Sequence, residues 1–247
     1  MLNLQYMIKR LIDMLFPVGF SCINCNKEIF DNEYMLCDNC KKSLPYLTGN
    51  LCLHCGNPIK SGKYCLYCKG KTFYCDKIVS PFEYDKVITK FIRNLKYDNK
   101  QYFSLCLAKF MAESFAKEYL PCDLVTCVPI CDKRLKQRGY NQSELLSNNF
   151  AKILNLETNF NLLKRIKETP TQTNLTFTER RKNMVNAFKV VDKDLVKDKY
   201  ILIIDDVYTT GATLTECAKT LKKAGAKAVY GVTAAHTIFS ENENKKH

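Results

Sequence analysis

The stretch ILIIDDVYTTGAT, residues Ile201–Thr213, decides the fold. It begins with four aliphatic residues, Ile201–Ile204, and a run this short and this apolar predicts a strand buried on both faces, as in a parallel sheet. Two carboxylates, Asp205 and Asp206, follow the predicted strand, and a loop of small residues follows the carboxylates. The stretch therefore predicts a buried strand that leads into acidic side chains and a loop.

A helix and a second strand are predicted after this loop. Apolar side chains recur at the spacing of one helical face, at Leu214, Cys217, Ala218 and Leu221. Gly225 is suited to end that helix, and the apolar run Ala228–Val232 predicts the next strand. The order strand, loop, helix, strand is typical of a parallel sheet covered by helices.

The loop has the properties of a phosphate-binding site. Its residues are Thr209, Thr210, Gly211, Ala212 and Thr213. A loop that enters a helix N-terminus presents free backbone N–H groups and the positive end of the helix dipole, and Gly211 allows an anion to approach closely. Two aspartates would repel a bare phosphate, but they can accept hydrogen bonds from the 2′ and 3′ hydroxyls of a ribose. The acid pair and the loop together therefore indicate a ribose 5-phosphate.

Two common phosphate-binding motifs, G-x-x-x-x-G-K-[ST] and G-x-G-x-x-G, are absent from this stretch. It instead resembles the phosphoribosyl-pyrophosphate (PRPP) motif of type I phosphoribosyltransferases, in which an apolar strand, two acids and a threonine- and glycine-rich loop follow one another. Two alternatives are an ordinary strand end with aspartate caps and a metal-only site built on the paired aspartates.

Length and composition fit a main domain with a small appendage. The chain has 247 residues, of which 46% are hydrophobic and 26% charged, and this suits one domain of about 150–200 residues with a short extra segment. No apolar run approaches the roughly 20 residues of a membrane span. The formal net charge of +13 favours nucleic acid or polyanionic small molecules such as pyrophosphate as partners. A lysine-rich surface without a dedicated ligand is the alternative.

The N-terminal residues 1–19 predict a short amphipathic helix. Its apolar face consists of Leu4, Ile8, Leu11 and Leu15. We expect this helix to dock on the protein, with a membrane surface as the alternative. Asp13 and Pro17 interrupt the apolar run and argue against a signal peptide, so a cytoplasmic location is expected.

Eight cysteines form four C-x2-C pairs between residues 22 and 68. Such repeats have the spacing of tetrahedral zinc sites with four thiolates, whereas disulfides are not expected in a cytoplasmic chain. The simplest pairing is sequential and gives one structural Zn²⁺ to Cys22, Cys25, Cys37 and Cys40, and a second to Cys52, Cys55, Cys65 and Cys68. A cross-braced pairing is the alternative. A segment this small has too little apolar material to fold without the metal.

A second domain is predicted after the cysteine-rich segment. Strands are expected over residues 77–84 and 123–128, with helices between and after them. This alternation predicts an α/β fold, a parallel sheet flanked by helices and preceded by a small double zinc ribbon. The predicted parts are an amphipathic helix over residues 1–19, a double zinc ribbon over 20–75, the α/β domain over 76–240 and a flexible tail over 241–247.

Two further stretches fit a site at the carboxyl ends of the strands. Val128–Gln142 leaves a strand and carries Arg134 and Arg138 among several cations. These predict a clamp for pyrophosphate or, alternatively, the solvated start of a basic helix. Lys164–Asn183 is polar, contains a proline and shows no periodicity. A loop of this length predicts a lid over the site or a flexible connector.

With these motifs in this order, the chain resembles the ComF/ComFC family of competence-associated, phosphoribosyltransferase-like proteins over nearly its full length. The resemblance rests on the double zinc ribbon, the PRPP motif, an N-terminal Leu15-Phe16-Pro17, and the motifs Leu95-Lys96-Tyr97, Val128-Pro129, Arg134-Leu135-x2-Arg138-Gly139-Tyr140-Asn141-Gln142 and Thr169-x2-Gln172-x2-Leu175-x4-Arg180-x2-Asn183. One departure is Ile130-Cys131-Asp132, where family members often have Leu-His-Pro. No role of that histidine position is therefore transferred.

The resemblance implies a type I phosphoribosyltransferase fold and a role in the uptake of transforming DNA beside a helicase-like partner. It also implies that Asp205 and Asp206 bind the ribose hydroxyls and that Thr209–Thr213 bind the 5-phosphate. Further implied candidates are Arg134 and Arg138 for pyrophosphate, and Gln172 and Arg180 in a mobile loop.

Two functions follow. The first is a phosphoribosyltransferase that uses Mg²⁺, in which an acceptor that the sequence does not identify displaces pyrophosphate at ribose C1. Candidate stacking faces for that acceptor are Tyr97, Tyr140 and Tyr208. The second is a non-catalytic zinc-ribbon adaptor that binds PRPP, single-stranded DNA or a helicase-like protein. Release of pyrophosphate in the presence of an acceptor supports the first function, and salt-dependent binding of single-stranded DNA supports the second.

Overall fold

The computed structural model describes residues 20–30, 33–71, 73–97, 100–167 and 182–239. The chain forms two compact units, Met1–Leu44 and Pro45–His247. Three predictions lie outside the described residues: the helix over residues 1–19, the candidates Gln172 and Arg180, and the tail over 241–247.

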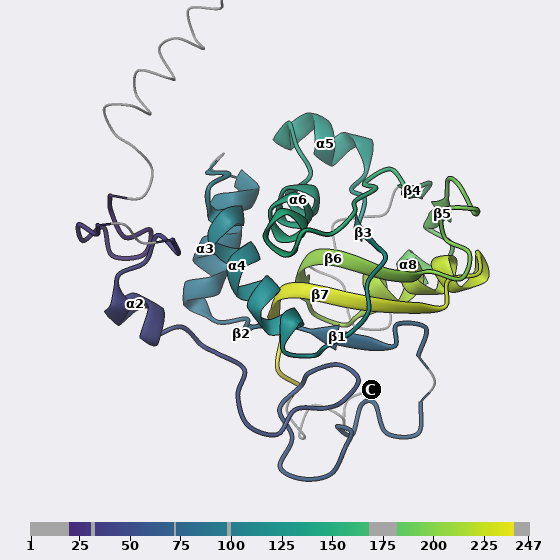
Figure 1. Cartoon of the computed structure of the whole chain (residues 1–247), viewed down its shortest axis with the longest axis horizontal. Coiled ribbons are helices and arrows are strands. Elements are labelled where there is room, and N and C mark those ends of the chain that lie inside the picture. The colour runs from purple at the N-terminus through teal and green to yellow at the C-terminus, as the bar shows by residue number, and fades with distance from the viewer. Residues whose placement is uncertain (1–19, 31–32, 72, 98–99, 168–181, 240–247) are drawn as a thin grey trace, which may run out of the picture. The chain divides into compact units, whose positions relative to one another are not determined.

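Five strands of the second unit form one parallel sheet (Figure 1). Its order is β1 (Lys77–Val79), β7 (Ala228–His236), β6 (Tyr200–Tyr208) and β3 (Leu124–Cys127), and β2 (Phe82–Glu83) also pairs with β7. Each pairing in this sheet is parallel, which confirms the predicted fold class. The strand predicted over residues 77–84 is divided in two, and Pro81, which has no N–H to donate to a neighbouring strand, lies in the gap.

The aliphatic residues Ile201–Ile204 of β6 are fully buried because helices cover both faces of the sheet. Helix α8 (Ala212–Lys223) packs on one face, where its Leu214 and Leu221 share a core with Ile201 and Ile203. The other face carries α4 (Phe103–Ala116) and α6 (Gln142–Leu154), with α3 (Lys86–Tyr97) packed against α4 (Figure 1). The predicted buried strand and the helix that follows it are therefore both confirmed.

A separate two-stranded antiparallel sheet consists of β4 (Leu163–Arg165) and β5 (Phe188–Val190). The sequence predicted that a loop begins at Lys164, and this start is wrong, because Lys164 and Arg165 pair with residues of β5. Between the sheet strand β3 and helix α6 lies a short helix, α5 (Asp132–Arg138), which contains the predicted basic clamp.

The second cysteine-rich segment belongs to the same unit as the sheet. Cys55 shares a core with Ile203 of β6. The backbone N–H of Ile78 in β1 donates to the carbonyl oxygen of His54 at 2.7 Å. Composition places a boundary near residue 75, whereas the compact units divide between residues 44 and 45.

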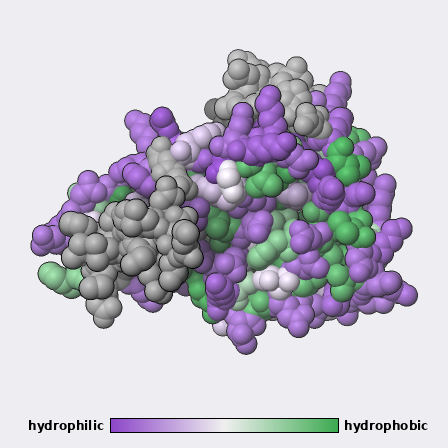
Figure 2. Space-filling view, turned by 90° about the horizontal axis from the view of Figure 1, so that it is seen from above, coloured by the Kyte–Doolittle hydropathy of each residue, from purple (hydrophilic) through white to green (hydrophobic). Residues whose placement is uncertain are grey.

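The described part of the first unit contains helix α2 (Asp38–Lys42) and the first four of the paired cysteines. Among the residues coloured by hydropathy in Figure 2, hydrophilic ones predominate, with hydrophobic residues exposed between them. None of the helices within the described residues has the length and apolar character that a bilayer crossing needs.

Candidate functional site

The two aspartates lie inside β6 rather than after it. The sequence predicted that the strand ends at Ile204, which is wrong, because β6 keeps its parallel pairing with β7 as far as Tyr208. Asp205 itself pairs with Thr233 of β7. The acid pair therefore occupies the carboxyl-terminal half of a strand with neighbours on both sides, where open α/β sheets bind ligands.

Asp205 is partly buried and accepts two hydrogen bonds at one oxygen. Ser143 Oγ, in the first turn of α6, and the backbone nitrogen of Asp206 each lie 2.9 Å from Asp205 Oδ1. Burial and the neighbouring Asp206 carboxylate raise the pKa of Asp205 to about 7, and these hydrogen bonds and Lys96 only partly oppose that rise. The carboxyl group can therefore change its protonation state near neutral pH.

Asp206 forms an ion pair with Lys96, which lies near the end of α3. The two side chains are 8% and 22% exposed, respectively. Gln142 Nε2, at the start of α6, lies 3.5 Å from Asp206 Oδ2. Burial acts to lower the pKa of Lys96, but the charge and hydrogen bond of Asp206, together with the charge of Asp205, raise that pKa above its ordinary value. The ammonium therefore stays charged and offsets part of the negative charge of the acid pair.

Arg138 is connected to Asp206 through Gln142. Its Nη1 donates to Gln142 Oε1 at 2.8 Å, and Gln142 in turn faces the Asp206 carboxylate. The guanidinium also lies over the ring of Tyr97, 5.0 Å from the centroid, and Nη2 donates to Tyr97 Oη at 3.3 Å. A cation predicted for pyrophosphate is thus held beside a carboxylate predicted for ribose.

Arg134 lies one helical turn before Arg138 on α5, so the two side chains share a side of that helix. A further cation, Arg165 of β4, lies within electrostatic reach of this group. Burial and then the Arg134 guanidinium lower the pKa of Arg165, while Asp205 acts in the opposite direction. Arg165 thus lies close enough to both Arg134 and Asp205 for their charges to act on it.

The loop after β6 leads into the N-terminus of α8, as predicted. Gly211 precedes that helix with a φ of 70°, a left-handed conformation that residues with side chains rarely adopt. Tyr208 packs so closely against Gly211 that an added Cβ would lie 2.5 Å from Tyr208 Oη. The hydroxyl of Thr210 accepts a hydrogen bond from the backbone N–H of Ala212 at 3.3 Å. The loop side chains that keep partial exposure are Thr209, Thr210 and Thr213.

The three tyrosines considered as stacking faces differ in their surroundings. Tyr97 is 68% exposed and lies beside Arg138. Tyr208 is only 3% exposed, and the hydroxyl of Tyr140 donates to the carbonyl oxygen of Leu95. Tyr97 is therefore the member of this set that offers its ring to a ligand at the site.

Three residues that contact the acid pair were not among the sequence candidates: Lys96, Gln142 and Ser143. Lys96 lies in the motif Leu95-Lys96-Tyr97, far before β6 in the chain, so no local pattern reveals its ion pair. Ser143 directly follows the basic motif that ends at Gln142. The sequence signal that could have located Ser143 is Asn141, a residue type that favours the N-cap of a helix. In the structure, Asn141 Oδ1 caps α6 by accepting a hydrogen bond from the Ser143 N–H at 3.1 Å.

The paired cysteines gather in two groups of four, and each group contains the members predicted by sequential pairing. The sulfur atoms within each group all lie within 4.8 Å of one another, as the ligands of one tetrahedral metal must. The cross-braced alternative is therefore wrong. Four thiolates leave no open coordination position, so both groups fit structural zinc. His54 belongs to neither group, and its ring stacks on Phe73 at 3.5 Å.

Family models match two parts of the chain: a double zinc ribbon domain over residues 11–69 and a phosphoribosyl transferase domain over residues 143–247. Competence protein F of Haemophilus influenzae is 33% identical over 222 residues, which make up 85% of this chain and 94% of that protein. The chain belongs to the competence protein F (ComF) family. This confirms the resemblance stated from the sequence, and it accounts for the presence of both a double zinc ribbon and a phosphoribosyltransferase-type sheet in one chain.

A second relative of this ComF-family chain is the DNA utilization protein YhgH of Salmonella typhimurium. It is 28% identical over 215 residues, which make up 84% of this chain and 93% of that protein. Among solved structures, glutamine PRPP amidotransferase from B. subtilis aligns with a TM-score of 0.37 and 20% identity, over 53% of this chain and 25% of that one.

Proposed function

We propose that this ComF-family protein binds PRPP at the end of β6 and transfers the phosphoribosyl group to an acceptor. The observation that carries the proposal is the acid pair Asp205–Asp206 on a strand that leads directly into the hydroxyl-bearing N-terminus of α8. Arg138 of α5 is connected to the Asp206 carboxylate through Gln142. This combination matches the three parts of PRPP, which are a ribose, a 5-phosphate and a pyrophosphate.

Each part of the ligand has a candidate partner in the proposed complex. Asp205 and Asp206 would accept hydrogen bonds from the ribose hydroxyls, and Thr209–Thr213 would hold the 5-phosphate. Arg134 and Arg138 would face the pyrophosphate. Gln172 and Arg180 remain candidates for a covering loop outside the described residues.

The proposed reaction is a displacement at ribose C1. The bond between C1 and the pyrophosphate oxygen breaks, its electron pair leaves with pyrophosphate, and the acceptor forms the new bond to C1. Positive charge that develops on the ribose would lie near the carboxylates of Asp205 and Asp206, and the negative charge of the leaving group would face Arg134 and Arg138. The chain then needs no nucleophile of its own, and Tyr97 would offer a face to an aromatic acceptor.

Mg²⁺ fits this site as a companion of the substrate. Within the described residues, three or more metal-ligating side chains come together only in the two cysteine groups. A magnesium ion would therefore take most of its ligands from phosphate oxygens, as it commonly does at phosphate-transfer sites. When bound, it would neutralise charge on the departing pyrophosphate.

Calorimetric titration of the zinc-loaded protein with PRPP, with and without Mg²⁺, tests the proposal. We expect Mg²⁺-dependent binding that is lost in the variant Asp205→Asn/Asp206→Asn. The matched control is Asp192→Asn/Asp194→Asn, which makes the same two substitutions at an exposed pair before β6 and should bind PRPP as the wild type does. Absence of PRPP binding by the wild type would rule out the enzyme.

We propose as a second function that the protein acts in the uptake of transforming DNA, in the cytoplasm, as an adaptor for single-stranded DNA or a helicase-like protein. The names of its relatives, competence protein F and DNA utilization protein, support this proposal. The net charge of +13 suits a polyanionic partner. Affinity for single-stranded DNA that falls steeply with salt, in a protein that does not bind PRPP, would favour this function over the enzyme.

A further inference from the structure

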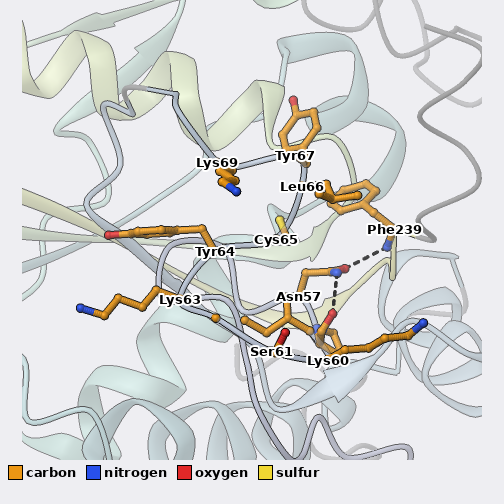
Figure 3. A pocket seen from close by; sticks show the side chains of 13 residues that line it. Asn57, Lys60, Ser61, Lys63, Tyr64, Cys65, Leu66, Tyr67, Lys69 and Phe239 are labelled. Carbon is orange, nitrogen blue, oxygen red and sulfur yellow. Dashed lines mark hydrogen bonds between the residues drawn. The ribbon is translucent and has the colours of Figure 1, made fainter.

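A groove of about 950 Å³ lies on the second cysteine-rich segment (Figure 3). Residues 57–67 and 69 line it, together with Phe239, which follows β7. The loop that joins the two C-x2-C pairs of the second zinc group therefore forms most of its wall. The groove and the sheet belong to one compact unit.

The floor of the groove is held by contacts between distant parts of the chain. Asn57 is 3% exposed, and its Oδ1 accepts a hydrogen bond from the backbone N–H of Phe239 at 2.9 Å (Figure 3). Its Nδ2 donates to the carbonyl oxygen of Pro58 at 2.9 Å. The rings of Tyr67 and Phe239 stack with their centroids 5.5 Å apart. The zinc ligand Cys65 lines the same cavity. The shape of the groove thus depends on both the metal site and the end of β7.

The lining combines positive charge with exposed apolar surface. Lys60, Lys63 and Lys69 line the groove, and its lining contains neither aspartate nor glutamate. Tyr64 is 50% exposed and Leu66 60% exposed. Within the described part of the chain, the ring of Tyr64 stacks on no other aromatic side chain and lies under no cation, so its face is available. Cations beside an available aromatic ring are the features with which proteins bind single-stranded nucleic acid, because unpaired bases stack while phosphates meet lysines.

We propose that this groove binds single-stranded nucleic acid, with a base stacked on Tyr64 and phosphates against Lys63 and Lys69. A duplex keeps its base faces stacked inside the helix, so it could use the lysines but not the ring. The proposal rests on the DNA-handling function proposed above and gives that function a surface. It does not involve the acid pair of β6, so the two sites can be tested separately.

The test is fluorescence anisotropy of a labelled 20-residue oligothymidylate with the zinc-loaded full chain, at several salt concentrations. Tyr64→Ala should weaken binding at least about 5-fold, because stacking on one aromatic ring is lost. Lys63→Ala/Lys69→Ala should make the negative slope of log affinity against log salt concentration shallower by about 1.4, because each of the two lost phosphate contacts contributes about 0.7. The matched controls are Tyr119→Ala, an exposed tyrosine after α4, and Lys193→Ala/Lys197→Ala, two exposed lysines outside the groove.

Several outcomes would overturn the proposal. Equal losses in the groove variants and their controls would show a general charge effect. Equal affinity for a matched duplex, lost to the same extent in Tyr64→Ala, would show that no unpaired base is recognised. Binding that appears only after deletion of residues 240–247 would make the chain's own C-terminal segment the occupant.

The PRPP site is measured in parallel to keep the two proposals distinct. Tyr64→Ala should bind PRPP as the wild type does, and Asp205→Asn/Asp206→Asn should bind the oligothymidylate as the wild type does. Loss of oligothymidylate binding in the aspartate variant would overturn the assignment to the groove. Failure of PRPP binding alone would leave the groove proposal supported by its own variants.

Discussion

Gly211 is a position that disfavours residues with a side chain for two separate reasons. Its φ of 70° is strained for any residue with a side chain. An added Cβ would also lie 2.5 Å from Oη and 2.7 Å from Cζ of Tyr208. Tyr208 cannot move freely out of the way, because it is 3% exposed and its ring packs 4.7 Å from that of His236.

Replacing Gly211→Ala should therefore lower the free energy of unfolding by about 2 kcal/mol or more, since backbone strain and overpacking add. Gly62→Ala is the matched control, because Gly62 has a φ of 89° but no heavy atom within 4 Å of an added Cβ. It should cost only about 1 kcal/mol, the backbone part. Urea unfolding followed by circular dichroism measures both, and equal losses would contradict the role of Tyr208.

The raised pKa of Asp205 predicts a pH dependence of stability. In the folded protein the carboxyl group of Asp205 has a pKa of about 7, whereas the ordinary pKa of an aspartate is 3.8. The folded state therefore gains from the proton at low pH, and this contribution is lost as pH rises through the folded pKa. Asp205→Asn has no such loss, so its unfolding free energy relative to the wild type should rise between pH 5 and pH 8. A difference that does not change with pH would contradict the shift.

At the residue scale, the sequence located the acids and the loop because they are contiguous and each has a direct chemical meaning. It could not locate Lys96 or Ser143, because their contacts with the acid pair form only when α3 and α6 pack near β6. Arg165 was missed for a related reason, since a polar stretch without periodicity was interpreted as a loop. Side-chain contacts between distant segments depend on packing, which no local pattern encodes.

At the scale of elements, β6 shows why a strand boundary is harder to predict than a strand. The aliphatic run Ile201–Ile204 predicts the buried part of the strand, and an acid pair after such a run normally indicates that the strand has ended. The strand continues because Asp205, Val207 and Tyr208 each pair with a residue of β7. These partners lie 28 residues further along the chain, so tertiary context overrides local preference.

Helix α3 is linked to the sheet through the ion pair of Lys96 and Asp206. Lys96→Met should lower the free energy of unfolding by roughly 2 kcal/mol, because a carboxylate is left without its partner, and the partial exposure of Lys96 makes this less than for a fully buried pair. A double-mutant cycle of Lys96→Met, Asp206→Asn and the variant with both substitutions should give a coupling energy of about 1 kcal/mol or more. Strict additivity in chemical denaturation would contradict the link.

At the scale of the whole molecule, the two zinc groups have different consequences because they belong to different compact units. The second group shares its core with the sheet, whereas the first lies in residues 22–40 of the other unit. Composition groups all eight cysteines into one ribbon domain. The contacts that join the second group to the sheet are long-range, so composition could not reveal them.

Loss of each zinc should therefore act differently on the main thermal transition. Cys55→Ser, at a fully buried ligand, should remove one zinc and lower that transition by roughly 10 °C or more. Cys25→Ser, at an exposed ligand of the first group, should also remove one zinc but shift the transition by only about 2 °C. Metal content by a colorimetric chelator and scanning calorimetry test this. Similar shifts in both variants would contradict the division.

The sheet order also determines what can happen while the chain is still being made. Lys77 of β1 pairs with Tyr230 of β7, and Asn57 meets Phe239, 182 residues further along. At about 5–20 residues per second, a ribosome adds the second partner roughly 10–40 s after the first. The second set of cysteines can thus capture its metal long before the strand it rests against exists. A ribosome that stops before residue 228 would release a metal-loaded product that lacks β7, so β1 and β2 would have no partner strand in the sheet. Proteases would recognise such an incomplete sheet as unfolded.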